Sequence, residues 1–343
     1  AMSYQTLSSV SFSSERHSNR LPAMAGVLLA VCVLSLLVGD APIAVVDIFR
    51  GLIGAADRVT NVIVLELRLP RMLLGVLIGA MLGASGAALQ GYLRNPLAEP
   101  AILGTSNAAG LGAVISLYFG LSEAIPLALP LMAGGFALFG MILVLVFSSR
   151  SPSSVSLILA GIALGSITGA GISLALNLST NPFAAMEISF WLLGSVEDRS
   201  LQHVAMAAPF ILVALAVLIT QRRALDAISL GEDVASTLGI HLGSVRVLLI
   251  SAISLGVGAS VAVAGAIGFI GLVAPHLARG FGEQSPSKQI IPSALIGAVL
   301  LVGADVLVRV LPTTNELKLG VVTALLGGPA LVYILYQSKR SIS

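Results

Sequence analysis

Long apolar runs recur along the whole chain and are separated by short polar intervals. A helix needs about 20 predominantly apolar residues to cross the roughly 30 Å hydrocarbon core of a bilayer. The pattern therefore predicts an all-α, polytopic membrane protein with ten transmembrane helices. We expect these spans at residues 21–39, 70–92, 100–120, 126–147, 154–176, 202–221, 244–264, 267–282, 290–310 and 319–337.

The number of spans depends on dividing the apolar stretch 244–282 in two. Gly265 and Gly268 act as hairpin breakers there, and the division places both termini on one side of the membrane. With both termini cytoplasmic, the positive-inside rule is obeyed. The basic residues then inside are Arg16, Arg20, Arg94, Arg150, Arg222, Arg223, Arg246, Arg279, Lys288, Lys339 and Arg340.

These orientations predict one transmembrane domain over residues 1–343, with a cytoplasmic tail at 1–20 and a cytoplasmic loop at 222–246. The first apolar run, 21–38, is followed by no persuasive small-residue cleavage site, so it is expected to be a retained span rather than a cleaved signal.

Composition agrees with this class and excludes others. The chain is 57% hydrophobic and only 10% charged, far from the composition of soluble domains. Its net charge of +2 forms no basic stripe with interleaved aromatic residues, which argues against nucleic-acid binding. The four histidines have no metal-ligand spacing on one helix, so no metal site is predicted.

Two glycine stripes predict close helix packing. Gly75, Gly79 and Gly83 recur every four residues, as do Gly161, Gly165 and Gly169. Small residues on one helical face let two backbones approach closely in lipid. These stripes indicate a tightly packed bundle and identify no substrate.

Arginines gather at the predicted outer face. Arg68 and Arg71 lie one helical turn apart at the top of the second span, and Arg309 lies near the same face. Guanidinium groups form bidentate pairs with carboxylates, so these side chains suit an acidic partner. Snorkelling to lipid headgroups, or pairing with Glu66 and Asp57, is the alternative.

The cytoplasmic loop contains an amphipathic segment. Leu230, Val234 and Leu238 recur every four residues, which predicts a short helix from near Ser229 to Gly239. An apolar stripe on such a loop needs a partner, either a protein subunit or the membrane interface.

Two apolar runs are broken by proline. Asn95-Pro96 stops the second span and predicts a re-entrant turn, with Arg94 and Glu99 near the cytoplasmic mouth. Pro275 and His276 mark a kink, with Arg279 at its inner end. The candidate gate or pathway residues are Asn95, Pro96, Glu99, Pro275, His276 and Arg279.

Five ordered motifs carry a resemblance to a known family. They are RLPR (68–71), LQGYLRNPLAEPAILGTSNAAG (89–110), GEDVASTLG (231–239), GAIGFIGLVAPHLAR (265–279) and NELKLGVVTALLGGP (315–329). The chain resembles the permease subunits of type II ABC importers for haem, iron-siderophores and cobalamin, known as FecCD-type permeases. One motif departs from the family, which often has Glu-Leu-Pro where this chain has Glu316-Leu317-Lys318.

The resemblance implies partners and roles. Two permease copies would form the pathway in a bacterial inner membrane, two separate ATPases would power it, and a periplasmic binding protein would deliver the cargo. Arg68, Arg71 and Arg309 would contact acidic residues of the binding protein. The ATPase would engage a coupling helix formed by Leu230, Gly231, Glu232, Val234, Ala235, Leu238 and Gly239.

The chain contains no Gly-x4-Gly-Lys-Ser/Thr loop, so ATP hydrolysis is assigned to the separate subunit. We expect a non-catalytic permease that binds no cofactor itself, while the ATPase uses ATP and Mg²⁺. The family favours haem or another iron chelate as cargo, and a ferric siderophore or cobalamin stays open. If the cargo is haem, His276 or Met81 is a candidate axial ligand.

Two other classes compete with this interpretation. An ion-coupled secondary transporter would need ionisable groups at mid-membrane depth, but Asp305 is the only acid well inside a predicted span. An intramembrane serine protease would use Ser85 of the Gly83-Ala84-Ser85-Gly86 string, with His203 or His276 as base. Ser85, however, also belongs to the predicted packing stripe.

Overall fold

The computed structural model describes most of the chain, and every regular element in the described residues is a helix. The described residues are 20–39, 41–125, 127–149, 154–179, 181–282, 285–312 and 317–340. The predicted tail, apart from Arg20, lies outside them, as do Arg150 and Glu316.

Each of the ten predicted spans coincides with a helix, which confirms the fold class. The helices are α2 (Arg20–Leu37), α5 (Leu69–Leu93), α6 (Thr105–Tyr118), α8 (Ala128–Ser149), α9 (Ser154–Leu178), α11 (Leu201–Thr220), α14 (Leu242–Ala264), α15 (Ile270–Gly280), α16 (Pro286–Val310) and α17 (Leu319–Arg340). Within the described chain, 7 helices are long and apolar enough to cross a membrane, while α6, α15 and the apolar part of α17, Leu319–Val332, are shorter.

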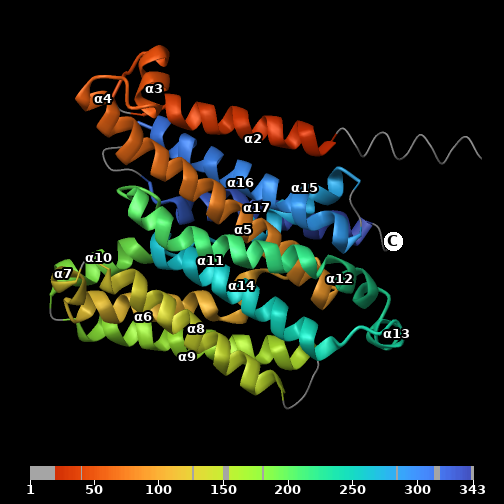
Figure 1. Ribbon diagram of the computed structural model, residues 1–343. Coiled ribbons are helices and arrows are strands. Elements are labelled where there is room, and N and C mark those ends of the chain that lie inside the picture. The colour runs from red at the N-terminus through yellow and green to blue at the C-terminus, as the bar shows by residue number, and fades with distance from the viewer. Residues whose placement is uncertain are drawn as a thin grey trace, which may run out of the picture.

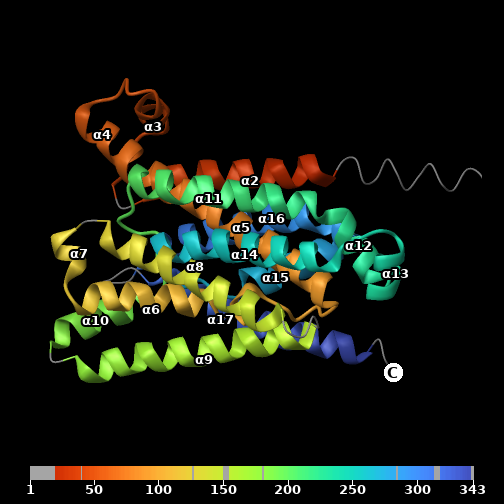
Figure 2. The same cartoon turned by 60° about the horizontal axis from the view of Figure 1, so that its bottom comes forward.

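The long helices run side by side, with short elements at both ends of the bundle (Figures 1 and 2). One end, called here the α13 end, carries α12 (Arg222–Ser229) and α13 (Glu232–Thr237) together with the start of α2 and the end of α17. The opposite end, the α3 end, carries α3 (Val45–Leu52), α4 (Arg58–Val62) and α7 (Leu121–Ala124). Both ends of the described chain therefore lie on one side, as an even number of crossings requires.

Dividing the stretch 244–282 in two is confirmed. Gly265 has φ +71, a conformation that favours glycine, and it ends α14, while α15 begins at Ile270. The 11 residues of α15 rise only about 16 Å, so this helix covers roughly half of a bilayer core and not the full span that the sequence predicted.

Helix α5 forms the centre of the bundle, and its glycine stripe explains how closely it packs. A Cβ at Gly79 or Gly83 would overlap the backbone of α16 at Gly297 or Ser293. The predicted packing role of this stripe is confirmed. The second stripe is only partly used, because Gly161 meets the carbonyl of Ile102 whereas no atom lies within 4 Å of a Cβ built at Gly169.

Several elements were missed or misplaced by the sequence pattern. Helix α10 (Pro182–Leu192) was not predicted, although Asn181 caps it and Pro182 occupies its first turn. The chain also enters α5 through a π-helical segment, η1 (Ile63–Arg68). The predicted start of the coupling helix near Ser229 is wrong: α12 ends there, Gly231 has φ +121, and α13 begins at Glu232.

The α5–α16 contact gives a test of packing. We expect Gly83→Ala to destabilise the protein by about 1–3 kcal/mol, because the added methyl would force α5 from the backbone of α16. The matched control is Gly303→Ala on α16, where a Cβ meets no atom within 4 Å. The control should be neutral or slightly stabilising, since alanine favours helix. Thermal unfolding in detergent compares the two variants. Equal unfolding midpoints would contradict the close packing of α5 against α16 at Gly83.

Candidate functional site

An arginine-lined pocket opens at the α3 end of the bundle. It encloses about 380 Å³ and brings together residues from four separate parts of the chain. Its charged lining residues are Arg68, Arg71, Glu197, Asp198, Arg199 and Arg309. The three arginines that the sequence singled out for docking thus share one pocket.

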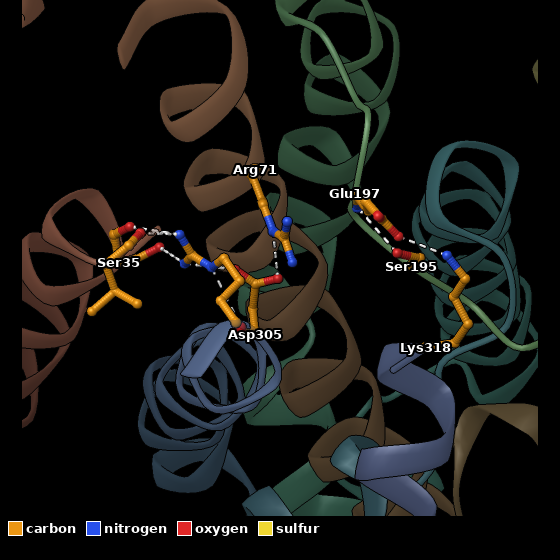
Figure 3. A network of polar contacts seen from close by, with 8 residues as sticks. Ser35, Arg71, Ser195, Glu197, Asp305 and Lys318 are labelled. Carbon is orange, nitrogen blue, oxygen red and sulfur yellow. Dashed lines mark hydrogen bonds and ion pairs between the residues drawn. The ribbon is translucent and has the colours of Figure 1, made fainter. Parts of the chain in front are cut away.

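One buried carboxylate holds two of these arginines. Arg71 Nε of α5 donates to Asp305 Oδ1 at 2.7 Å, and Arg309 Nη2 lies 2.8 Å from Asp305 Oδ2 (Figure 3). Asp305 is only 1% exposed. A buried ion pair is stable only when geometry and hydrogen bonding offset the cost of desolvation, and here two guanidiniums share that task. The cluster joins α5 to α16 at the α3 end.

The C-terminus of α2 is held by Arg309 and by a third arginine of the pocket, Arg68. The last four carbonyls of a helix have no partner within the helix, and α2 has no basic residue in its own last turn. Arg309 Nη1 donates to the carbonyls of Ser35 and Val38 at 2.9 and 2.7 Å. Arg68 Nη1 donates to the carbonyl of Leu36 at 2.8 Å. Two guanidiniums from α16 and the start of α5 therefore cap α2 and complement its dipole.

The guanidiniums of Arg68 and Arg309 accordingly point into the protein. Arg68 is 5% exposed, and its Nη2 also donates to the carbonyl of Ala41 at 2.7 Å. Asp57, an alternative partner suggested by the sequence, accepts hydrogen bonds from the backbone of Val59 and Thr60 at the start of α4. The docking role of the three arginines stays a prediction, and the structure adds that two of them also hold α2.

Arg199 is a further pocket residue that the sequence reading missed. Its Nε is buried and makes no hydrogen bond to a described residue. Burial lowers the pKa of the Arg199 guanidinium, and the carboxylates of Asp198 and Glu197 oppose this effect. The only sequence signal was the charged string at 197–199 in a short polar interval.

Lys318, the departure from the family motif, has a defined contact. Its Nζ lies 2.6 Å from Glu197 Oε2, and the backbone N–H of Glu197 donates to Ser195 Oγ at 3.1 Å (Figure 3). Two residues later, the backbone N–H of Gly320 donates to the carbonyl of Leu193 at 3.0 Å. The loop before α17 is therefore fastened to the loop after α10.

At the α13 end, an apolar stripe is exposed as predicted. Leu230, Val234 and Leu238 are 69%, 44% and 63% exposed. Ala235 on the opposite face of α13 is fully buried, while Gly231 and Gly239 adopt positive φ on either side of the helix. We call residues 222–246 the coupling segment.

The coupling segment is anchored to the bundle at two points. Asp226 Oδ1 accepts the backbone N–H of Ser287 at 2.8 Å, which satisfies a free donor in the first turn of α16. Arg246 is buried, and its Nε donates to Tyr92 Oη at 3.1 Å, while its Nη1 donates to the carbonyl of Ser148 at 3.1 Å. These contacts tie the segment to α16, α5 and α8.

Three of the predicted gate residues, Asn95, Pro96 and Arg279, lie together around the C-terminal end of α5. Arg279 Nη1 donates to Gln90 Oε1 at 2.8 Å, and Gln90 Nε2 donates to the carbonyl of Ala98 at 3.2 Å. Asn95 Oδ1 accepts the N–H of Leu97 at 2.9 Å, so Asn95 and Pro96 form the predicted turn. Glu99 precedes η2 (Pro100–Leu103), a re-entrant turn before α6. Arg94 and Glu99, both expected near the cytoplasmic mouth, form no ion pair with each other in the described residues.

Pro275 shapes the contact between α15 and α5. A proline has no N–H, so the carbonyl of Gly271, four residues earlier, lacks its usual helical donor. That carbonyl faces Gly86 of α5, where an added Cβ would overlap it. His276 lies half-buried on the same helix. The proline that the sequence singled out therefore lies at a glycine-mediated helix contact, and the kink itself stays a prediction.

Other candidate chemistry lacks the required geometry. Ser85 is buried, and its Oγ has no hydrogen-bond partner in the described chain, so no base contacts it as a protease nucleophile would require. Met81 is fully buried and packs against Gly256 of α14. The described residues contain no group of three or more His, Cys, Asp or Glu side chains that could hold a metal ion.

The bundle thus defines a multi-pass helical membrane protein with an arginine pocket at one end and an exposed coupling segment at the other. The sequence profile of the FecCD transport family matches residues 27–337, and the chain belongs to this family.

Named relatives and a solved structure agree with the family. The vitamin B12 import system permease protein BtuC of Vibrio cholerae is 40% identical over 321 residues, covering 92% of this chain and 93% of that protein. The Fe(3+)-citrate import system permease protein YfmE of Bacillus subtilis is 37% identical over 321 residues, covering 92% and 94%. A metal-chelate type ABC transporter solved in an inward-facing conformation has a TM-score of 0.84 and 28% identity, covering 93% of this chain and 99% of that one.

The buried cluster at Asp305 predicts a large difference between two ion pairs. We expect Asp305→Asn to cost about 3–5 kcal/mol, because it leaves Arg71 and Arg309 without their shared counter-charge. Glu197→Gln, which breaks the partly exposed pair with Lys318, should cost about 1 kcal/mol or less. Thermal unfolding of both variants measures the difference. An Asp305→Asn variant as stable as Glu197→Gln would show that the buried cluster does not hold α2, α5 and α16 together.

Proposed function

We propose that this chain is the membrane-spanning permease subunit of an ATP-driven importer in a bacterial inner membrane. The observation that carries the proposal is the coupling segment, whose exposed apolar stripe is held firmly on the ends of α5, α8 and α16. In this proposal the α13 end and both termini are cytoplasmic. Two copies of the chain, two ATPase subunits and a periplasmic binding protein make up the working importer.

The coupling segment is suited to receive force from the ATPase. Leu230, Val234 and Leu238 present an apolar surface that an ATPase groove would cover, and their exposure excludes a role in the core of a single chain. ATP and Mg²⁺ belong to that separate subunit, and the permease carries no cofactor of its own. The movement is a rigid-body shift of packed helices rather than chemistry on the cargo.

The arginine pocket is suited to receive carboxylates of the binding protein. Arg71 and Arg199 are the arginines of this pocket that retain side-chain exposure, and Arg199 Nε is without a described hydrogen-bond partner. Carboxylates aligned with these guanidiniums would form charge-assisted hydrogen bonds. Arg68 and Arg309 would contribute mainly positive potential, because they are already engaged with α2.

The homodimer with the pathway between two copies follows from the family, and apolar faces on α9 and α17 are exposed to lipid or to a second copy. Helix α9 presents Val155, Leu159, Ile162, Ile167, Leu174 and Leu178, and α17 presents Leu325, Leu326 and Val332. In that arrangement, the α15–α5 contact at Pro275 and the turn at Asn95–Pro96 lie where a moving helix pair could gate access.

The cargo is proposed to be a bulky metal chelate. The relatives named above are described as permeases for vitamin B12 and Fe(3+)-citrate, which favours cobalamin or a ferric chelate. Haem stays a prediction from the family alone. Met81 is a poor candidate for a haem ligand because it is fully enclosed by the bundle.

An ion-coupled secondary transporter has less support. Asp305 is the acid that such a mechanism would use, and it is already paired with Arg71 and Arg309. A carboxylate held by two guanidiniums is a poor proton or sodium relay, because protonating it would remove the negative charge that both guanidiniums share.

The coupling stripe gives the first functional test. We expect Leu230→Ser combined with Leu238→Ser to weaken binding of the ATPase subunit by about 10-fold or more, because about 1.4 kcal/mol of lost apolar burial is already tenfold. Ser236→Ala, an exposed change on α13 between these two leucines, is the matched control. Binding to the permease in nanodiscs gives the affinities. Unchanged affinity in the double variant would contradict the proposed coupling role.

The arginine pocket gives the second test. We expect Arg199→Gln to weaken binding of the binding protein about 3- to 10-fold at low salt, with the difference shrinking as salt rises, since screening reduces such contacts. Arg50→Gln, on exposed α3 outside the pocket, is the control. Arg68→Glu and Arg309→Glu are unsuitable alone because they would also release α2. Equal affinity for wild type and Arg199→Gln at low ionic strength would argue against docking in this pocket.

A further inference from the structure

A basic pocket lies beside the coupling segment, and we propose that it receives a carboxylate side chain of the ATPase subunit. The inference rests on the proposed function and adds a second, charged point of contact to the apolar stripe. The pocket encloses about 880 Å³ at the α13 end, between the C-terminus of α5, helix α12, the end of α15 and the start of α16.

The pocket has an excess of positive charge. Among the residues that the structure describes, Arg94, Arg223 and Arg279 line it, and Asp226 is the one carboxylate. Asp226 is already used, because its Oδ1 accepts the backbone N–H of Ser287 at 2.8 Å. Arg279 donates to the neutral amide of Gln90. The side chains of Arg94 and Arg223 make no hydrogen bond or ion pair with any residue that the structure describes, so the pocket offers guanidinium donors to an anion.

The backbone at Arg94 points to a role for its side chain. Arg94 ends α5 with φ 50 and ψ 36, the left-handed conformation in which glycine is favoured. A residue with a Cβ costs roughly 1 kcal/mol there, which glycine would avoid. The chain nevertheless has an arginine at the wall of a basic pocket. Strain at a non-glycine residue is a mark of functional sites, and here it coincides with an unpaired charge.

The position of the pocket identifies its occupant. Leu230 and Leu238, both members of the exposed coupling stripe, also line this pocket. A partner that covers the stripe must therefore lie over the pocket as well. A carboxylate next to the partner's apolar groove would reach Arg94 and Arg223, whose planar guanidiniums can each form paired hydrogen bonds with it.

The test is ATPase binding by variants that lose one charge each. Arg94→Gln and Arg223→Gln in full-length permease, in nanodiscs of uncharged phosphatidylcholine, should each bind the purified ATPase subunit about 10-fold more weakly than wild type at low salt. Arg222→Gln is the matched control, because Arg222 is the exposed neighbour of Arg223 and does not line the pocket. It should change the affinity less than twofold.

A further variant separates binding from folding. Arg94→Gly removes the charge and also relieves the backbone, so its thermal unfolding midpoint should equal or exceed that of wild type while ATPase binding weakens about 10-fold. Wild-type affinity in Arg94→Gly and Arg223→Gln would overturn the inference.

The leucine variants distinguish failure of the charged contact from failure of the proposed function. If Leu230→Ser with Leu238→Ser abolishes binding while the arginine variants bind normally, the proposed function stands and the charged contact does not. If neither set changes binding, the proposed function fails as well. If the arginine variants differ from wild type only in nanodiscs containing anionic phospholipid, the pocket holds a lipid headgroup, which would contradict an ATPase carboxylate.

Discussion

The close packing of α5 against α16 is the constraint on which the rest of the structure depends. Their backbones meet where a Cβ at Gly79, Gly83 or Gly297 would overlap the backbone of the other helix. At one end of this pair Asp226 of the coupling segment caps α16, and at the other end Asp305 joins Arg71 to Arg309. Because α16 has 25 residues and rises roughly 37 Å, it connects the coupling segment to the arginine pocket through one rigid element. A displacement at the α13 end can therefore reach the α3 end without melting a helix.

The two ends of the bundle use charge differently. At the α3 end, Arg68 and Arg309 satisfy the unpaired carbonyls of α2, so the pocket that we assign to the binding protein is built from groups that also hold the fold. At the α13 end, the side chains of Arg94 and Arg223 make no hydrogen bond or ion pair with described residues and line a large pocket. Lys318 stands where the family often has proline, and its pair with Glu197 links the pocket at the α3 end to the start of α17.

Much of the fold, and part of the candidate site, could be predicted from the sequence. Apolar length and glycine spacing gave all ten principal helices and the contact face of α5, because both depend on local pattern. The exposed stripe at Leu230, Val234 and Leu238 also follows from spacing alone. The burial of Arg68, the shared carboxylate of Asp305 and the pocket position of Arg199 could not be predicted, because these contacts join residues far apart in the chain. Gly231 shifted the start of α13 through its positive φ, which a periodic apolar pattern does not report.

Uptake by proteoliposomes containing the permease, its ATPase and its binding protein tests the central claim most directly. Vitamin B12, ferric citrate and haem would be offered separately, with and without ATP. The account predicts accumulation of one metal chelate that requires ATP and the binding protein together. Absence of ATP-dependent uptake of any of them, with uptake instead driven by an imposed ion gradient, would contradict it.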